Sequence, residues 1–496
     1  MKIVVVGGGT AGWLAALIIS KTQPQHNVTV IESSTINIIG AGEGSTGTMT
    51  NIIQNISGNY GCNEQDFINE CDVTPKLGID FKNWSGNGTS YISPNDGSWT
   101  STNPLDFITA YTVANLPKEK RHLNSLYGFI IEHNKYTFDL KDGPAAYHFD
   151  AFKVGMYFKK VCGEHVGHID SEVQEVIFNE QGEIKTLKLA NGQNLDGDFF
   201  IDATGLSRVL ISKLGAKWNS YKENLPVNRA MPFLMPYDQN EVIRPVTVAW
   251  AQNNGWMWDI PVLHRRGCGY VYANDFVSDD QAHYELEQTI GKKVDPLRVI
   301  KFEAGRLDQL WVKNCLAVGL CAAFAEPLEA TSIHTTIVQL ENFVNLCLDS
   351  SKEITCDLRN IQMYNDRFTF MYDLIKDFLV LHYQSGRKDT EFWKHVTSSK
   401  VLTPHTEKII GMCKYRMPNN SIFPGIGGAS GWPLWAYILS GTDNLTAKVA
   451  QQELELHKVD LYAKIQYERL SIEAFETIKN LPDNTDAIRK RQIKCF

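Results

Sequence analysis

The chain has 496 residues, of which 43% are hydrophobic and 21% charged, a composition typical of a globular protein with more than one domain core. Its formal net charge of −8 argues against a nucleic-acid partner, because such proteins usually present basic surfaces. Ten scattered cysteines without a C-x-x-C pair predict reduced thiols, a cytoplasmic location and no metal site, and the longest apolar run, Cys315 to Ala325, is too short to cross a membrane.

The first 32 residues predict a strand at Ile3–Val6, a helix at Trp13–Ser20 and a second strand at Val28–Ile31. Between the first strand and the helix lies Gly7-x-Gly9-x-x-Gly12, and an acidic residue ends the second strand. This context predicts a dinucleotide site, in which backbone amides approach a pyrophosphate and the acidic side chain binds a ribose hydroxyl. The predicted cofactor contacts are Gly7, Gly9, Thr10, Ala11, Gly12 and Glu32.

Later segments return to the same domain. Val173–Phe178 and Glu183–Leu189 predict a hairpin, and Phe199–Gly205 predicts a buried strand that runs into a turn of small residues. That late strand favours FAD over NAD as the dinucleotide, because FAD domains bring such a strand back to the cofactor crevice. The remaining predicted elements are a β-rich stretch at 246–275, a strand at Leu316–Gly319, and helices near 331–348, 358–383 and 442–480.

The run Gly255–Pro261 contains two tryptophans separated by one residue, Trp256 and Trp258. In an extended strand both indoles point to the same face. Two such rings can wall off an apolar cavity and exclude water from it. The run therefore predicts a partition inside the protein.

Two further segments carry polar side chains with open interpretations. Thr331 and Ser332 follow Glu326-Pro-Leu-Glu329 where a helix begins, and amides there can hold an anion such as a halide or phosphate, or merely form an ordinary capped helix start. Lys76 opens a predicted strand at Lys76–Phe81, on the face opposite its apolar residues. A lone strand lysine is usually solvated, and it can act as a positioned donor or nucleophile only if it faces a cavity.

Taken together, these motifs resemble those of the flavin-dependent tryptophan halogenases. The family carries the same glycine turn, the Gly-Trp-x-Trp-x-Ile-Pro run, the lysine before an alternating strand, and a Glu-Pro-Leu-Glu-Ser-Thr segment. Secondary matches are Ala41-Gly42-Glu43, Tyr147–Asp150, Asn314-Cys315, and Asp377-Phe378-Leu379 to His382-Tyr383. The resemblance covers roughly residues 1 to 440 and adds Gly42, Glu43 and Gly319 to the expected cofactor contacts.

The resemblance implies a reaction that uses FADH2 from a separate flavin reductase, O2 and a halide (chloride, bromide or iodide) to form hypohalous acid. It implies that Thr331 and Ser332 bind the halide, and that Trp256 and Trp258 separate flavin from substrate. Lys76 then receives the oxidant, held by a hydrogen bond or as a haloamine, and Glu329 takes the ring proton. The expected partner is a small aromatic molecule, and the oligomeric state stays open.

Several departures mark a divergent member. Ala330 replaces the serine of Glu-Ser-Thr, which suggests a looser site for bromide or iodide. Tyr91–Asn95 lacks the aromatic-His-Pro-aromatic indole clamp of many relatives, so the substrate is expected to be an electron-rich aromatic or indole-like molecule rather than strictly free tryptophan. The late strand ends at Gly319-Leu320 without the aspartate of many flavin monooxygenases. The residues suggested as a remade substrate wall are Trp99, Trp432 and Trp435.

The expected fold is α/β (α+β): a Rossmann-like FAD domain of the flavin monooxygenase type, an interwoven β-rich layer and a helical C-terminal substrate cap. The FAD domain is predicted over 1–50, 150–215 and 300–350, the β-rich layer over 51–149 and 216–299, and the cap over 351–496. Two alternatives remain at this point. One is a flavin-dependent aromatic hydroxylase, which the tryptophan wall disfavours, and the other is a non-catalytic flavoprotein.

Overall fold

A computed structural model describes residues 1–36, 43–96, 107–138, 140, 146–346, 354, 356–419 and 432–494. Its first layer is a six-stranded sheet in the order β20-β21-β12-β1-β2-β8. All neighbours are parallel except the edge strand β20, so the sheet needs helical crossovers. The strands are β1 (Lys2–Val6), β2 (Asn27–Glu32), β8 (Val166–Asp170), β12 (Phe199–Asp202), β20 (Trp311–Val312) and β21 (Cys315–Ala317).

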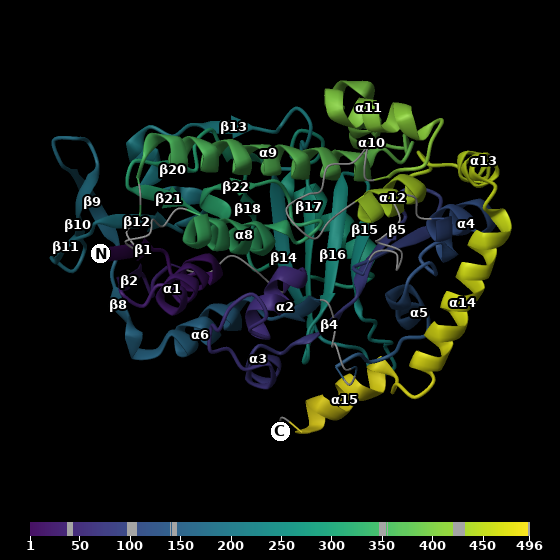
Figure 1. The fold of residues 1–496 in the computed structure, drawn as a ribbon, viewed down its shortest axis with the longest axis horizontal. Helices are drawn as coiled ribbons and strands as arrows, with labels where there is room; N and C mark the ends of the chain where they lie inside the picture. Colours follow the sequence, from purple (N-terminus) through teal and green to yellow (C-terminus); the bar gives the residue numbers. More distant parts are fainter. Residues whose placement is uncertain are drawn as a thin grey trace.

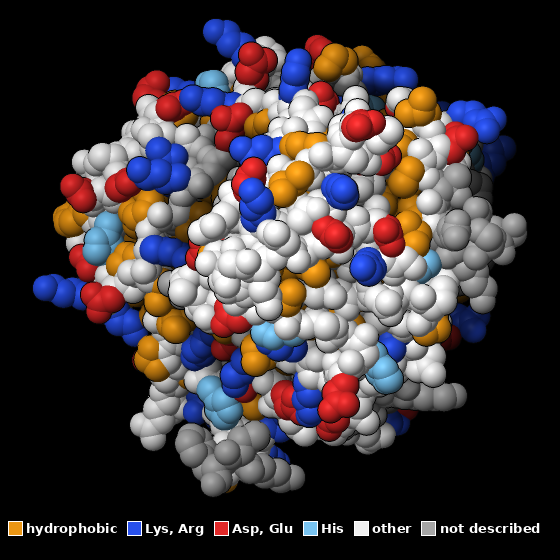
Figure 2. All heavy atoms as spheres, turned by 90° about the vertical axis from the view of Figure 1, so that its left-hand side faces the viewer, with side chains coloured by type: hydrophobic (Ala, Val, Ile, Leu, Met, Phe, Trp, Pro, Cys, Tyr) orange, Lys and Arg blue, Asp and Glu red, His pale blue; other side chains and the backbone are white. Residues whose placement is uncertain are grey.

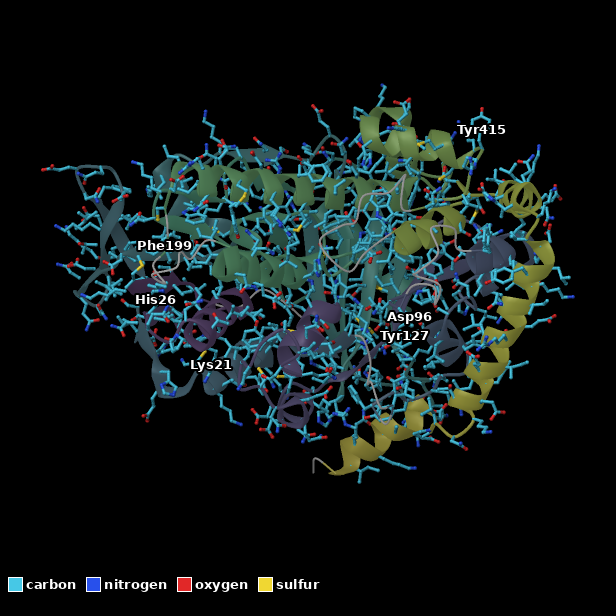
Figure 3. The ribbon with its side chains drawn as sticks, in the orientation of Figure 1. Lys21, His26, Asp96, Tyr127, Phe199 and Tyr415 are labelled. Carbon is cyan, nitrogen blue, oxygen red and sulfur yellow. The ribbon has the colours of Figure 1, made fainter. Side chains whose placement is uncertain are left out.

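Three helices pack beside this sheet: α1 (Thr10–Thr22), α6 (Ala151–Cys162) and α8 (Thr331–Leu346). The α1 helix lies between the other two, and its residues from Gly12 to Ser20 are all buried because both flanks are covered. Phe199, in the middle of the sheet, is fully buried, whereas Tyr415 projects into solvent at the opposite end of the molecule (Figure 3). The predicted Rossmann-like core is therefore confirmed, including the late return of β12 and β21 to the side of β1.

The second layer is a seven-stranded sheet in the order β18-β14-β17-β16-β15-β5-β6. Only the β15–β5 pair is parallel, as expected for a layer built mainly from hairpins. The strands are β5 (Gly78–Lys82), β6 (Ser90–Pro94), β14 (Arg229–Met235), β15 (Val246–Ala251), β16 (Gly255–Pro261), β17 (Arg266–Tyr272) and β18 (Ile300–Lys301).

Three small sheets complete the β structure. The predicted hairpin is present as β9 (Val173–Phe178) and β10 (Ile184–Leu189), which carries β11 (Asn194–Asp196) at its edge and extends from one end of the molecule (Figure 1). That end shows acidic and basic side chains interspersed (Figure 2). The other two sheets comprise β13 (Trp218–Ser220), β19 (Gly305–Leu307) and β22 (Ala323–Phe324), and β3 (Glu43–Gly44), β4 (Thr74–Lys76) and β7 (Ala146–Phe149).

The C-terminal region is helical, as expected for a cap. Its longest helix, α9 (Leu358–Tyr383), begins where the Asp357 side chain accepts a hydrogen bond from the Arg359 amide. It runs from the edge of the first sheet toward the second (Figure 1). The helices that follow are α10 (Glu391–Val396), α11 (Pro404–Cys413), α12 (Trp432–Gly441), α13 (Ala447–His457), α14 (Asp460–Ile478) and α15 (Asn484–Lys494).

Shorter helices lie between the strands of the central region, and α14 packs along two of them, at the edge of the molecule farthest from the first sheet (Figure 1). They are α2 (Gly47–Ile53), α3 (Glu64–Glu70), α4 (Phe107–Asn115), α5 (Leu126–Glu132) and α7 (Asp279–Ile290). In the described residues, every helix is too short or too polar to traverse a lipid bilayer. The division of the chain into two discontinuous domains and one continuous C-terminal domain stays a prediction.

Candidate active site

The turn between β1 and α1 is built from glycines, and it cannot accept side chains at two positions while a third faces open space. Gly7 has φ = 117°, and a Cβ there would lie 2.3 Å from the Ala203 carbonyl oxygen. A Cβ on Gly12 would lie 1.8 Å from the Gly7 carbonyl oxygen, so neither position accepts a side chain. A Cβ on Gly9 would meet open space, which places the free face of the turn at this glycine.

The first turn of α1 provides backbone donors at the same place. Gly9 is the N-cap of α1 and supplies no side-chain cap, so the amides that follow, at Thr10 and Ala11, face outward for an anion. Gly319 lies directly beside them, with φ = 65°, and a Cβ there would come within 2.7 Å of the Ala11 Cβ. The chain segment after β21 therefore packs against the first turn of α1 too closely for a side chain at Gly319.

Glu32, at the end of β2, is held in a fixed orientation. Its Oε2 accepts a hydrogen bond from Trp13 Nε1 (3.1 Å), and its Oε1 lies 2.6 Å from Lys159 Nζ and 2.8 Å from His168 Nε2. The sequence pattern did not identify Lys159 and His168, which reach Glu32 from α6 and β8. The only available signal was that they lie on an amphipathic helix and on a strand of the same domain.

Glu43 begins β3 and lies on the other side of the region. Burial, assisted by the negative charge of Asp150, raises the pKa of the Glu43 carboxyl to about 7. Two of the expected site residues, Gly42 and Trp99, lie outside the described residues, as does the side chain of Trp432, the first residue of α12. The glycine turn, the start of α1, Glu32 and Gly319 lie together, an arrangement compatible with the pyrophosphate and ribose of a dinucleotide.

We expect Gly12→Ala to weaken FAD binding at least about 100-fold, because the new methyl group must displace the Gly7 carbonyl and so deform the phosphate turn. Titration of the purified protein with FAD, followed by flavin fluorescence, measures the change. Gly411→Ala is the matched control, since a Cβ there meets no atom within 4 Å. Equal FAD affinities for Gly12→Ala and the control would contradict this assignment of the turn.

The two tryptophans of β16 lie on one face of the second sheet, as predicted. Trp256 is 1% exposed and Trp258 is 9% exposed, with ring centroids 6.3 Å apart and ring planes inclined by 59°. Gly269 on β17 makes space for this pair, because a Cβ there would lie 2.1 Å from the Trp258 ring. The indoles form a packed apolar wall, and Trp256 also lies against the Tyr383 hydroxyl.

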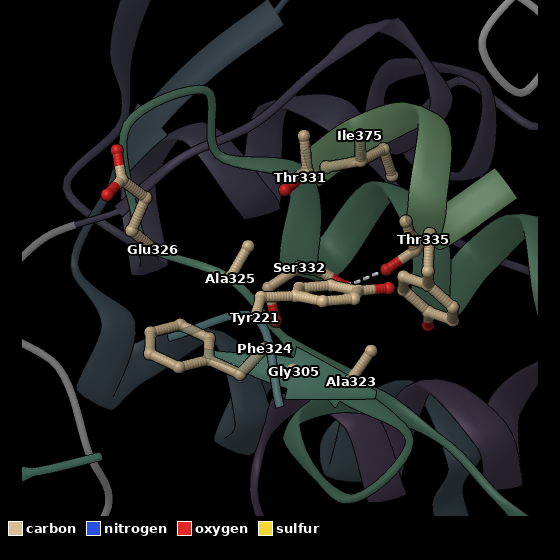
Figure 4. A pocket seen from close by; sticks show the side chains of 11 residues that line it. Tyr221, Gly305, Ala323, Phe324, Ala325, Glu326, Thr331, Ser332, Thr335 and Ile375 are labelled. Atoms are coloured by element: carbon tan, nitrogen blue, oxygen red, sulfur yellow. Dashed lines mark hydrogen bonds between the residues drawn. The ribbon is translucent and has the colours of Figure 1, made fainter. Parts of the chain in front are cut away.

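The segment before α8 forms a tight turn beside a cavity. Ala330 has φ = 52°, which is uncommon for a residue with a Cβ, and the turn is closed by a hydrogen bond from its amide to the Pro327 carbonyl (3.2 Å). Thr331 and Ser332, the first two residues of α8, line the cavity. Figure 4 shows them across it from Phe324 and Tyr221. This places backbone donors of a helix N-terminus at the cavity.

Glu326 lines the same cavity and is 2% exposed. Its Oε2 accepts a hydrogen bond from the Tyr383 hydroxyl (2.9 Å), and burial raises the pKa of its carboxyl to about 8. A neutral carboxylic acid here does not repel an anion bound at the start of α8. Tyr383 therefore connects the cavity to the wall formed by Trp256 and Trp258.

The strand that carries Lys76 differs from the prediction. Lys76 ends β4, which pairs with β7, and a separate strand, β5, begins at Gly78. The chain changes sheets at Leu77, whose amide donates to Pro245 while its carbonyl accepts from Asn95, so the predicted continuous strand is wrong. The break directs Lys76 inward rather than toward solvent.

Lys76 is only 2% exposed, and its ammonium donates a hydrogen bond to the Ser45 carbonyl (3.1 Å). Burial lowers the pKa of the Lys76 amine to about 8, and the nearby charge of Glu329 opposes part of that shift. The interpretation of Lys76 as a solvated strand lysine is therefore wrong. The amine and the Glu329 carboxyl therefore lie near enough in the interior to act on each other electrostatically.

Glu329 is bound by a residue from the far end of α9. Its Oε1 lies 2.7 Å from His382 Nε2, and the Nδ1 of the same ring lies 2.8 Å from the Phe378 carbonyl oxygen. The Phe378 ring packs on His382 and on Trp435, at centroid distances of 4.7 and 5.2 Å. Trp435 therefore belongs to the same group of packed rings as Phe378 and His382. No role was predicted for His382 or Tyr383 from the sequence, although both lie in the last turn of a helix that was predicted.

A Rossmann-like nucleotide domain, a pair of buried tryptophans and a buried lysine beside a carboxyl group together point to the class of flavin-dependent enzymes. The sequence profile described as tryptophan halogenase matches residues 2–467. The chain therefore belongs to the tryptophan halogenase family, and it is an FADH2- and halide-dependent halogenase, an oxidoreductase. The resemblance stated from the motifs is confirmed, and the hydroxylase alternative is not favoured.

Individual relatives agree over nearly the whole chain. The 7-chloro-L-tryptophan 6-halogenase of Kutzneria sp. (strain 744) is 30% identical over 473 residues, covering 88% of this chain and 90% of the relative. The crystal structure of the tryptophan halogenase from Shewanella frigidimarina superposes with a TM-score of 0.87 at 26% identity, covering 100% and 98% of the two chains. The tryptophan C-6 flavin-dependent chlorinase of taromycin biosynthesis gives a TM-score of 0.87 at 27% identity, with 99% of each chain covered.

Proposed function

We propose that this enzyme halogenates an electron-rich aromatic or indole-like small molecule, not strictly free tryptophan, using FADH2 supplied by a separate flavin reductase. The observation that carries the proposal is the buried Lys76 amine, which interacts electrostatically with the Glu329 carboxyl. An isolated buried ammonium is costly, and such a group is retained where it serves chemistry. The relatives' names, which include tryptophan and chlorotryptophan halogenases, support an indole-like ring as one substrate class.

The cofactor is assigned to the cradle formed by the glycine turn, the start of α1, Glu32, Glu43 and Gly319. When bound, reduced FAD supplies with O2 the oxidising equivalent that converts halide to hypohalous acid. The halide is assigned to the amides of Thr331 and Ser332, where a helix N-terminus favours an anion. Trp256 and Trp258 exclude water and keep the organic substrate out of the flavin chamber.

Lys76 then controls the transfer. Its ammonium donates a hydrogen bond to the oxygen of hypohalous acid and so makes the halogen more electrophilic. The aromatic ring attacks the halogen, the oxygen–halogen bond breaks, and the oxygen leaves as water with the Lys76 proton. Glu329 takes the proton from the halogenated carbon, and the electron pair of that C–H bond restores aromaticity. The net change is replacement of one ring hydrogen by halogen with release of water.

The packing of Tyr91, whose hydroxyl is affected by the charge of Glu329, supports a substrate other than strictly free tryptophan. Tyr91, in the segment that departs from the family clamp, lies on β6 and stacks on Phe81 at 4.8 Å with an angle of 13° between the rings. Its ring fills the space above Gly441, where a Cβ would come within 2.2 Å of it. The tyrosine is thus packed into the wall rather than free to clamp a ring.

We expect the halogenation rate to fall as the pH rises through about 8, because the Lys76 amine, with its pKa lowered to that value, then loses the proton that it donates to the oxidant. The alternative haloamine route needs the free amine and predicts a rise through the same pH. Product formation between about pH 6.5 and about pH 9.5, with FADH2 supplied in excess, distinguishes the two. A flat profile contradicts both forms of the Lys76 role.

The test of the proposed function is a product analysis. The protein is incubated with FAD, a flavin reductase, NADH, each halide in turn and a panel of indoles and phenols including free tryptophan. Mass spectrometry is expected to show products that gain a halogen and lose a hydrogen. Strict use of chloride would end the looser halide site suggested by Ala330. Products that gain one oxygen would overturn the halogenation proposal in favour of hydroxylation.

A further inference from the structure

His382 lies in the last turn of α9 and is fully buried, at 0% exposure. Both of its ring nitrogens are engaged, Nδ1 with the Phe378 carbonyl at 2.8 Å and Nε2 with Glu329 Oε1 at 2.7 Å. Within the described part of the chain, no other acidic side chain bonds to His382. The ring is fixed on its sides by Phe81 and Phe378, at centroid distances of 5.2 and 4.7 Å.

These contacts determine where the protons are. A carbonyl oxygen can only accept, so Nδ1 carries a hydrogen that it donates to Phe378. An ionised carboxylate can also only accept, so a bare Nε2 at 2.7 Å from Glu329 would place two acceptors against each other. At least one proton therefore lies between Nε2 and Oε1, and the pair is an imidazolium–carboxylate contact or its neutral equivalent.

The second oxygen of Glu329 is left available. Oε2 makes no hydrogen bond with any residue in the described ranges, and the Glu329 side chain is 12% exposed. The other groups that act electrostatically on Glu329 are Lys76 from β4 and the Tyr91 hydroxyl from β6. His382 is thus the group that holds one carboxylate oxygen, while the other is left without a hydrogen bond to the described residues, in a carboxyl that acts electrostatically on Lys76.

We propose that His382 is a positioning residue for Glu329: it fixes Oε1 through a shared proton and keeps the carboxylate ready to take the ring proton on Oε2. The inference rests on the proposed function. In this step the C–H bond of the halogenated carbon breaks, its electron pair returns to the ring and its proton goes to Oε2. The proton between Nε2 and Oε1 stays in place, so no further reactant is needed.

Two variants separate the contacts of His382. His382→Asn keeps an amide near the Phe378 carbonyl but is too short to reach Glu329, whereas His382→Gln can donate to Glu329 without becoming charged. We expect kcat for halogenation to fall about tenfold in His382→Asn and about threefold or less in His382→Gln, with KM unchanged in both. FADH2 oxidation should be unaffected.

An isotope effect gives the readout that a purely structural role would not move. With substrate deuterated at the halogenated carbon, the wild-type enzyme is expected to show no primary effect, because ring deprotonation is fast, and His382→Asn is expected to show one. His457→Asn is the matched control, since it breaks another His–Glu contact (3.1 Å to Glu453) far from the site on α13. Unchanged kcat and no isotope effect in His382→Asn would overturn the inference.

A measurement that does not depend on catalysis keeps the inference testable even if a variant is inactive because it folds poorly. Proton NMR of the wild-type protein should contain a downfield imidazole N–H signal from the shared proton, and this signal should shift in Glu329→Gln and disappear in His382→Gln. A spectrum in which both variants keep the signal overturns the inference. Failure of the proposed function is distinguishable, because the wild-type enzyme would then yield no halogenated product while the NMR signal remained.

Discussion

Replacing Lys76 by methionine is expected to lower halogenation about 1000-fold while FADH2 oxidation continues. Methionine is similar in shape to lysine but has no N–H, so it cannot donate a hydrogen bond to the oxidant. Its thioether can be oxidised by hypohalous acid to the sulfoxide, a reaction that consumes the oxidant without delivering halogen to the ring. Halogenated product and flavin oxidation are measured in the same reaction, and free oxidant is trapped with a soluble thiol. Retained halogenation would remove Lys76 from the mechanism.

The same variant should fold more stably. The Lys76 pKa falls from 10.5 to about 8 in the folded protein, so below pH 8 the buried ammonium costs about 3 kcal/mol, and stability returns as the pH rises from 8 toward 10.5. We therefore expect Lys76→Met to raise the free energy of unfolding by up to about 3 kcal/mol at pH 7, and by little at pH 10.5.

Denaturant unfolding at the two pH values measures this difference. Lys82→Met is the matched control, because Lys82 is an exposed residue on the neighbouring strand β5 and lies over the Trp250 ring. The control should keep wild-type halogenation and gain no stability. A loss of stability in Lys76→Met at pH 7 would show that the hydrogen bond to the Ser45 carbonyl outweighs the burial of the charge.

The second large effect is expected at Glu329. Glu329→Gln preserves the shape of the side chain and a hydrogen bond to His382, but it removes the base that takes the ring proton. We expect kcat for halogenation to fall about 100-fold with KM nearly unchanged, because the lost interaction belongs to the transition state rather than to binding. Initial rates over a range of substrate concentrations separate the two parameters.

Glu341→Gln is the control for this variant, since Glu341 lies on α8 and its carboxyl accepts a hydrogen bond from the Tyr60 hydroxyl (3.3 Å) rather than from His382. Its halogenation rate should equal that of the wild type. A rise in KM with unchanged kcat in Glu329→Gln would assign Glu329 to substrate binding, and the proposed proton transfer would then need another base.

Local patterns in the sequence predicted much of the fold. The apolar spacing between Ile361 and Leu379 predicted a helix at 358–383, and α9 has those bounds because one side of it packs on buried structure along its whole length. The alternation around Trp256 and Trp258 placed both rings on one face for the same reason. Such periodicity shows which side of a helix or strand is buried in the final fold, and a short stretch of sequence is enough to reveal it.

The local sequence patterns could not predict the contacts between side chains that organise the site. Glu329 and His382 are separated by 53 positions, and Glu326 and Tyr383 by 57, so no local spacing relates them. The strand break at Leu77 was also missed, because its cause is pairing with two different sheets rather than a glycine or proline signal at that residue. Chemistry-bearing residues were identified, but their partners depend on tertiary packing.

The final turn of α9 fixes two carboxyl groups through neighbouring residues, His382 for Glu329 and Tyr383 for Glu326. An α-helix advances about 1.5 Å and rotates about 100° per residue, so a single-residue insertion or deletion upstream would swing both side chains away together. The length of α9 therefore sets where His382 and Tyr383 lie relative to the first sheet. Its solvent-facing positions can diverge freely among homologues, whereas its length is the property that selection must preserve.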